Sequence, residues 1–338
     1  MPGTPRPLAV ICIILFIAFM IVRQNGMLPE IAHPILQAIP SSINDIPAPS
    51  QPHNIYELPS NSKLLSPCIP SLSGPPVLIS SEQVPSTYPR ALKLRNGTLL
   101  ASYTIFSPQT TLLLSSSHDL GLTWQSYSQI YTVSPTSHVQ LNNAFLLQLP
   151  SGRLLCSMRA HDMVPELEFA EEKPGGENEN YAYYRLMIYY SDDIGRTWKY
   201  LSTPVEGKGP MNGLWEPFMR VDNKGDLQFY YSMEVNPRDQ DNLVRTSQDG
   251  GLTWSDSVYV SGEGLKTRDG MMGIQEVSPG SGHLIAVFES VEEKGEVVTF
   301  EARFEIFIVT SHDDGKSWGE RKMIAAGLHG DLSMYPPA

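Results

Sequence analysis

The stretch Ser247-Gln-Asp-Gly-Gly-Leu-Thr-Trp254 is one of four copies of an eight-residue pattern, S-x-D-x-G-x-[ST]-W. The other copies are residues 117–124, 191–198 and 311–318, and the four copies hold four of the five tryptophans. The Asp can accept hydrogen bonds from the turn, the Gly can take positive φ, and the indole can cover the turn. The pattern therefore predicts hairpin fasteners with structural aspartates: Asp119, Asp193, Asp249 and Asp313.

A second repeated signature precedes each copy. It is an apolar strand, a turn containing Gly, and another apolar strand, with the glycines at Gly97, Gly152, Gly225 and Gly282. Alternating apolar runs separated by short Gly turns are typical of β-hairpins. The hairpin supplies two strands, and the eight-residue pattern forms the turn between two more. Each unit therefore has four strands. The sequence thus predicts an all-β fold with four such units.

The eight-residue pattern resembles the Asp-box, or BNR, repeat of sialidase-like β-propellers. The resemblance covers about residues 75–338 and implies four-stranded blades around a central axis. Propellers of this kind have six blades, so four evident blades imply that the propeller is truncated. The closing stretch Met334-Tyr-Pro-Pro-Ala338 looks like the opening of another unit, since Thr87-Tyr-Pro-Arg-Ala91 begins the first.

Composition narrows the class of partners and cofactors. The formal net charge is −12, and no cluster of basic residues stands out, which argues against nucleic acid and anionic membrane surfaces as partners. The three cysteines form no disulfide framework. No metal-ligand spacing of Cys and His and no phosphate-binding loop is present. We expect a monomer without cofactor or metal, and Cys156 as a buried free thiol.

The N-terminal part of the chain differs from the rest. Residues 7–22 are apolar and flanked by Arg6 and Arg23, so residues 1–23 are predicted to be an uncleaved signal anchor or a cleaved signal peptide. Residues 24–76 form a Pro/Ser-rich linker, and residues 77–338 the propeller. Either N-terminal alternative predicts an extracellular or lumenal domain, secreted or anchored by a single membrane pass.

The single glycosylation sequon, Asn96-Gly-Thr98, is compatible with that route. Its other interpretation is the Asn-Gly turn of a tight hairpin. Any membrane contact is expected to involve the N-terminal segment alone.

The hairpins also predict where a site would lie. The start of the first strand and the end of the second meet at one rim of each blade, and polar residues there are candidates for binding rather than packing. The expected substrate-binding residues are Tyr88, Arg90, Asn142, Asn143, Arg159, His161, Trp215, Arg268 and Asp269.

Two carboxylates on this rim are predicted to be catalytic. Glu216 lies between bulky apolar neighbours in Trp215-Glu-Pro-Phe218, and Glu289 ends an apolar strand. Glycoside cleavage needs such a pair, one group as nucleophile and one as acid, and different surroundings would separate their pKa values. Glu234 is a reserve candidate. Glu276 lies within a first strand and is expected to face a neighbouring blade.

Around these residues the sequence resembles the exo-arabinanases of glycoside hydrolase family 93. The matching stretches begin at Tyr88, Asn142, Trp215, Tyr230 and Val287. The resemblance implies a retaining, exo-acting α-L-arabinanase that cleaves an oligo- or polysaccharide with two glutamates in successive blades, placed here on Glu216 and Glu289. That family also uses a tyrosine from a late blade, and no such residue can be placed in this chain.

Two alternatives stay open. An exo-sialidase would need a cluster of arginines for the substrate carboxylate, and the Arg-Ile-Pro stretch of sialidases has Tyr88 at the matching position. The second alternative is an inactive carbohydrate-binding propeller on a membrane stalk.

Overall fold

The computed structural model describes residues 75–80, 84–164, 181–210, 213–236, 238–292 and 304–325. The predicted N-terminal segment 1–23, nearly all of the linker 24–76, and Met334–Ala338 lie outside these residues. Nothing in the described part of the chain is a helix that could cross a membrane.

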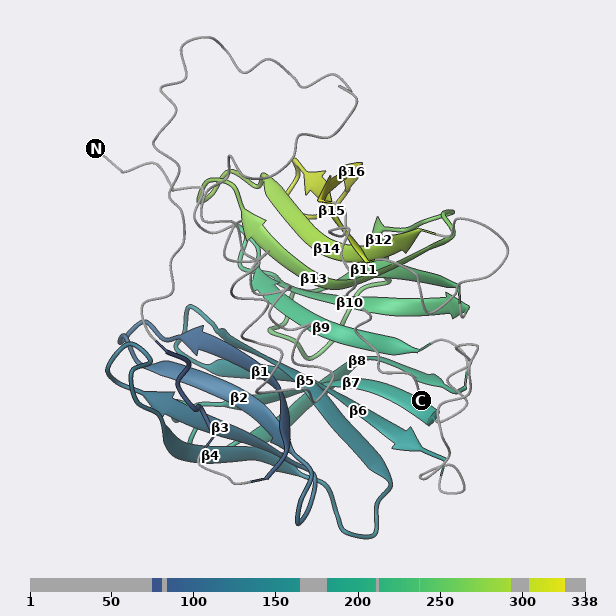
Figure 1. Ribbon diagram of the computed structural model, residues 1–338. Helices are drawn as coiled ribbons and strands as arrows, with labels where there is room; N and C mark the ends of the chain where they lie inside the picture. The colour runs from purple at the N-terminus through teal and green to yellow at the C-terminus, as the bar shows by residue number, and fades with distance from the viewer. Residues whose placement is uncertain are drawn as a thin grey trace, which may run out of the picture.

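Sixteen strands make up the described part of the chain, and they follow one another in four antiparallel sets (Figure 1). The strands are β1 (Ser86–Lys93), β2 (Leu99–Ile105), β3 (Thr111–Ser117), β4 (Gln125–Thr132), β5 (Val139–Gln148), β6 (Leu154–Met163), β7 (Tyr181–Ser191), β8 (Lys199–Lys208), β9 (Leu214–Val221), β10 (Leu227–Asn236), β11 (Asp239–Ser247), β12 (Val258–Ser261), β13 (Thr267–Glu276), β14 (Leu284–Glu292), β15 (Glu305–Ser311) and β16 (Gly319–Ala325). We call β1–β4, β5–β8, β9–β12 and β13–β16 blades 1 to 4. The all-β prediction is confirmed, and these blade-like sheets fit a propeller.

One feature of the sheet order was not predicted. Blades 1 and 2 are separate four-stranded sheets, but blades 3 and 4 are joined by a parallel pairing of β11 with β13 at Gln240 and Arg268. Side-chain hydrogen bonds reinforce this parallel pairing. Arg268 Nη2 donates to Gln240 Oε1 at 3.1 Å, and Gln240 Nε2 donates to the carbonyl of Asp269 at 2.9 Å. The two blades are therefore tied together at the rim where the site was expected.

The hydrophobic core lies between the blades. Alternation along each strand sends apolar side chains to both faces of a sheet, and each interface between successive blades is filled by one apolar cluster. Leu114 and Met158 are fully buried between blades 1 and 2, Leu186 and Phe229 between blades 2 and 3, and Phe288 between blades 3 and 4. Cys156 is a buried free thiol in the first of these clusters, and burial raises its pKa.

The four Asp boxes close the turn between the third and fourth strand of each blade. In the third box, Ser247 Oγ donates to Asp249 Oδ1 (2.8 Å), and Thr253 donates to Asp249 through its amide (2.9 Å) and hydroxyl (2.6 Å). The other boxes repeat these bonds. The aspartates therefore bind their own turns, at the rim opposite the predicted site.

The boxes also join neighbouring blades. Ser128 of blade 1 donates to the carbonyl of Gly195 in the second box, and Ser202 of blade 2 donates to that of Gly251 in the third, each at 2.5 Å. Gln228 of blade 3 donates to the carbonyl of Asp314 in the fourth box at 2.7 Å. Each box after the first thus fastens its blade to the preceding one.

We expect Asp249→Ala to lower the melting temperature of the chain by several degrees, because four hydrogen bonds to the carboxylate are lost. Hydrogen bonds to its carboxylate hold the pKa of Asp249 below its usual range, and the bond from the Thr253 hydroxyl has the largest effect. Their stabilisation is therefore complete above the ordinary pKa of an aspartate, about 3.9, and is lost as the pH falls below it.

Thermal melts of wild type and variant between neutral and acid pH test this expectation. The matched control is Asp256→Ala, because Asp256 is exposed and its side chain makes no hydrogen bond among the described residues. Equal melting of Asp249→Ala and the control would contradict a fastening role.

Candidate active site

The first strand of every blade carries a β-bulge at the same place. The ladder register shifts after Thr87, Asn142, Trp215 and Gly270. The next residue in each case has positive φ, although none is a glycine: Tyr88 (52°), Asn143 (54°), Glu216 (55°) and Met271 (53°). A non-glycine residue in this region costs roughly 1–3 kcal/mol and is commonest at functional sites, and bulges redirect side chains.

This geometry corrects two sequence-based expectations. The candidate residues lie within the strands, several of them at bulges, and not beyond the strand ends. In blade 4, the residues equivalent to Trp215 and Glu216 are Gly270 and Met271, two positions after the predicted Arg268 and Asp269. The alternation of apolar residues does not reveal where a bulge lies. A bulge adds one residue to a strand, and every later side chain then points to the other face.

Glu216 is held by the neighbouring blade. Its Oε2 accepts a hydrogen bond from the amide of Met271. Burial raises the pKa of Glu216, whereas the Met271 amide and the guanidinium groups of Arg90, Arg159 and Arg268 act in the opposite direction. The carboxylate therefore has one fixed oxygen and three positive groups around it.

Glu289 lies close to Glu216 but in different surroundings. It is paired across the ladder with Gly270, and a Cβ on Gly270 would lie 3.3 Å from Glu216 Oε2. Glu289 Oε2 is buried and has no hydrogen-bond partner in the described part of the chain. Burial, followed by the charge of Glu216, raises the pKa of Glu289 to about 8. Burial therefore favours the protonated form of Glu289, whereas the groups around Glu216 favour its charged form.

Of the three arginines around Glu216, two have other contacts. Arg268 forms an ion pair with Glu234 at 2.6 Å, so the reserve candidate Glu234 is already neutralised. Arg159 Nη2 donates to Gln140 Oε1 at 2.6 Å, and its guanidinium lies 4.8 Å from the Trp215 ring centroid. Arg90 makes no side-chain hydrogen bond among the described residues, where its Nε is buried without a partner.

His161 lies beneath the site rather than facing it. The ring is fully buried. Its Nε2 lies 2.8 Å from the carbonyl of Leu214, and its Nδ1 accepts from the Arg185 amide at 3.1 Å. Burial, above all, lowers its pKa well below the usual range. A neutral His161 therefore packs edge-on to Trp215, at a ring distance of 5.3 Å, and both ring nitrogens face backbone groups.

Tyr88, Asn142 and Asn143 come from blades 1 and 2. Burial raises the pKa of Tyr88, and the charges of Arg159, Glu216 and Arg90 also act on it, which places its phenol near Glu216. The side-chain amide of Asn142 has hydrogen-bond partners in the orientation in which its nitrogen donates to Thr87 Oγ1 (3.3 Å) and its oxygen accepts from Arg159 Nη2 (3.2 Å). Asn143 Oδ1 is buried and has no partner among the described residues.

Asp269 is not brought to the site. It is fully buried, and its Oδ1 accepts from Ser290 Oγ at 2.6 Å and pairs with Arg321 at 3.0 Å. It therefore binds β14 and β16 of its own blade. Glu276, as predicted, faces a neighbouring blade, since Asn223 of blade 3 donates to it at 3.0 Å.

Sequence reasoning missed several residues of this rim. Gln140 and Gln240 hold Arg159 and Arg268, and Gly270 leaves room for Glu216. The only available signal for Gly270 was its place in a strand, which often marks a close backbone approach. Among the described residues, no group of three or more metal-ligating side chains could hold a metal ion.

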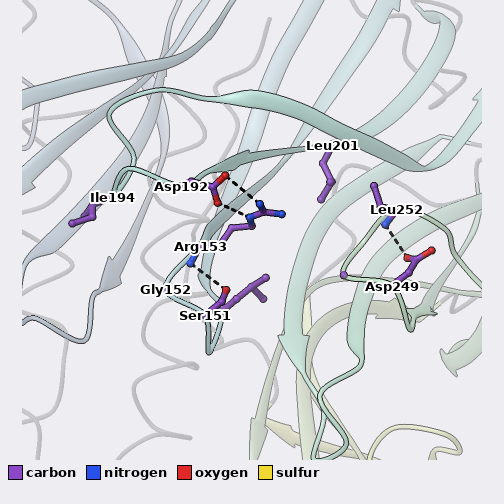
Figure 2. A pocket seen from close by; sticks show the side chains of 10 residues that line it. Ser151, Gly152, Arg153, Asp192, Ile194, Leu201, Asp249 and Leu252 are labelled. Atoms are coloured by element: carbon purple, nitrogen blue, oxygen red, sulfur yellow. Dashed lines mark hydrogen bonds and ion pairs between the residues drawn. The ribbon is translucent and has the colours of Figure 1, made fainter.

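A depression of about 580 Å³ lies elsewhere, at the rim that carries the Asp boxes (Figure 2). Its lining includes Ser151 and Gly152 of a hairpin turn and Asp249 of the third box. Arg153 is already paired with Asp192 at 2.7 Å there. Arg153 and Asp192 thus bind each other and Asp249 binds its own turn, so the bulge rim remains the candidate active site.

Comparison with known proteins gives a family and a fold. The model of the BNR repeat-like domain matches residues 74–337. The GH93 α-L-arabinofuranosidase of Fusarium graminearum is 24% identical, with a TM-score of 0.53. The α-L-arabinanase of Penicillium chrysogenum is 23% identical, with a TM-score of 0.51. Each likeness covers 70% of this chain and 66% of the solved one, just under two thirds of its length.

A protein of unknown function from Dyadobacter fermentans is 19% identical and has a TM-score of 0.53. No curated protein matches the chain.

Proposed function

The chain belongs to the BNR repeat-like family, and we propose that it is a retaining glycoside hydrolase that removes α-L-arabinofuranosyl groups from the end of a polysaccharide. The observation that carries this proposal is the pair of unlike carboxyl groups, Glu216 and Glu289, at the bulge rim. The fold shared with an α-L-arabinanase and an α-L-arabinofuranosidase, each solved with arabinobiose, supports the choice of sugar.

Glu289 is the proposed acid. Its pKa of about 8 keeps it protonated at neutral pH, and a general acid works best when its pKa lies near the working pH. As the bond between the anomeric carbon and the leaving oxygen breaks, the Glu289 proton passes to that oxygen. The buried, unpartnered Oε2 of Glu289 is free to meet a ligand.

Glu216 is the proposed nucleophile. Burial raises the pKa of Glu216, and the Met271 amide and three guanidinium groups oppose that rise by stabilising its ionised form. An electron pair of its carboxylate forms an ester bond to the anomeric carbon while the leaving group departs. A water molecule then attacks the same carbon, gives its proton to Glu289, and releases the sugar and the Glu216 carboxylate. Two inversions give net retention.

The position of the two carboxyls supports retention over inversion. Glu216 Oε2 rests against Gly270, and Glu289 is the cross-strand partner of Gly270. Retaining enzymes need carboxyls about 5–5.5 Å apart, whereas inverting enzymes leave about 6.5–9.5 Å for a water molecule.

The ligand itself is proposed to be a neutral sugar. Buried polar atoms without partners at the rim suit the hydroxyl groups of a sugar: Arg90 Nε, Asn143 Oδ1, Arg159 Nε, Trp215 Nε1 and Glu289 Oε2. Trp215 and Tyr88 offer rings for stacking. A sialidase would use several arginines for one carboxylate. Here Arg268 is neutralised by Glu234, and Arg159 is bound to Gln140, which disfavours the sialidase alternative.

The place of action is a further part of the proposal. The apolar residues 7–22 suggest that the domain works outside the cytosol, either secreted or anchored by this segment.

The test is incubation of the full chain with linear α-arabinan and with an aryl α-L-arabinofuranoside, followed by proton NMR of the first product. We expect release of single arabinose units in the α configuration, before mutarotation. Initial appearance of the β anomer would contradict retention. Binding of arabinan without any release would favour the alternative of a binding propeller.

A further inference from the structure

Blade 4 holds the proposed nucleophile of blade 3 through its backbone. The bulge in β13 places Met271 at φ 53°, and the Met271 amide donates to Glu216 Oε2. Glu216 Oε1 accepts no hydrogen bond in the described part of the chain. The two oxygens of this carboxylate are therefore in different states before any ligand arrives.

Gly270 makes this contact possible. A Cβ at this position would lie 2.9 Å from Gln240 Nε2 and 3.3 Å from Glu216 Oε2. Both distances are shorter than ordinary van der Waals contact. Gln240 cannot withdraw freely, because it bonds Arg268 and the carbonyl of Asp269. A side chain at Gly270 would thus displace the Glu216 carboxylate.

We propose that the Gly270–Met271 bulge positions the nucleophile: the Met271 amide holds Glu216 Oε2, which leaves Oε1 as the oxygen that attacks the anomeric carbon. This inference rests on the proposed function. Oε1 forms the ester bond and Oε2 becomes the ester carbonyl, still bonded to the amide. When water attacks the anomeric carbon, the bonding electrons return to Oε1 and the amide again stabilises a carboxylate. Gly270 and Met271 are positioning residues, since neither touches the reacting carbon in this scheme.

The first experiment needs no substrate. In the full chain with Glu289→Gln, Glu216 is the only titrating carboxyl of the pair. Its δ-carbon signal and the Met271 amide proton signal are followed by NMR against pH. We expect both to move with one midpoint. A Met271 amide that does not respond while Glu216 titrates would overturn the proposal.

The second experiment displaces the carboxylate. Gly270→Ala should raise the midpoint of the Glu216 titration by about one pH unit, because two to three amide bonds can lower a carboxyl pKa by about two units or more. It should also lower kcat for an aryl arabinofuranoside by about 10-fold, because the carboxylate is displaced by less than the roughly 1 Å that costs about 100-fold, with KM within about twofold. The matched control is Gly207→Ala, since a Cβ at Gly207 meets no atom within 4 Å.

Different results would contradict the proposed function and the proposed role of the bulge. A wild-type chain that cleaves no arabinofuranoside would contradict the proposed function, while the titrations still decide whether the bulge holds Glu216. An unchanged Glu216 midpoint and kcat in a folded Gly270→Ala variant, equal to those of Gly207→Ala, would overturn the positioning role. If Gly270→Ala does not fold, the titration in the Glu289→Gln chain decides alone.

Discussion

Glu216→Gln is expected to reduce turnover of arabinan by roughly 10⁴-fold or more, the scale on which loss of an enzymatic nucleophile acts. The amide oxygen of glutamine can still accept from the Met271 amide, but it cannot form the glycosyl ester. Because glutamine has the same shape as glutamate and fills the same space, the fold should persist. Initial rates and thermal melts of the purified full chain measure the two effects.

External azide separates a nucleophile from a merely structural glutamate. In a Glu216→Gly variant, azide can enter the vacated space and attack the anomeric carbon once, which gives a glycosyl azide of inverted configuration. In Glu289→Gly, attack occurs on the enzyme ester, and the product is retained. Full activity of Glu216→Gln would remove the hydrolase role of this residue and favour the binding propeller.

Glu289→Gln is the second change with a large expected effect. The wild-type rate should fall as the pH rises through about 8, because the protonated Glu289 carboxyl is the active acid, and it should also fall at acid pH, where the Glu216 nucleophile becomes protonated. In the variant this basic limb should disappear, and hydrolysis of arabinan should fall by about 10²–10⁴-fold, the usual contribution of a general acid. Aryl leaving groups that are already good need no protonation. For such substrates the rate of the first step, formation of the glycosyl ester, should fall far less in Glu289→Gln.

The same shift has a consequence for stability. The folded-state pKa of Glu289 lies above its unfolded value of about 4.3, so its contribution is complete below that value and is lost as the pH rises through about 8. The wild-type melting temperature should therefore decline between about pH 4.3 and about pH 8 more steeply than that of Glu289→Gln. Glu234→Gln is the control, because Glu234 is a carboxylate at the same rim that is paired with Arg268. Its pH–rate profile and melts are measured in the same way. A basic limb that persists unchanged in Glu289→Gln would contradict its role as the acid.

Much of the fold was predictable because its signals are local. A Gly turn, a strand of alternating apolar residues and an Asp box act over a few residues each, so Gly152 and Asp193 could be placed without coordinates. The resemblance to BNR repeats was likewise confirmed by the family match over residues 74–337. The site was predicted in outline only. Glu216, Arg90 and Arg159 were placed at the rim, but Asp269 was placed there too, although it binds Arg321 within blade 4.

The sequence by itself determined the all-β fold, the four units and the rim on which polar residues gather, since these follow from hydrophobic period and turn chemistry along the chain. Only the tertiary structure decided which of those residues meet. In β13 the bulge lies at Gly270 and Met271, two residues after Arg268 and Asp269, so Gly270 and Met271 occupy the positions equivalent to Trp215 and Glu216. The raised pKa of Glu289 likewise arises from burial beside a residue of another blade, a contact that no local pattern encodes.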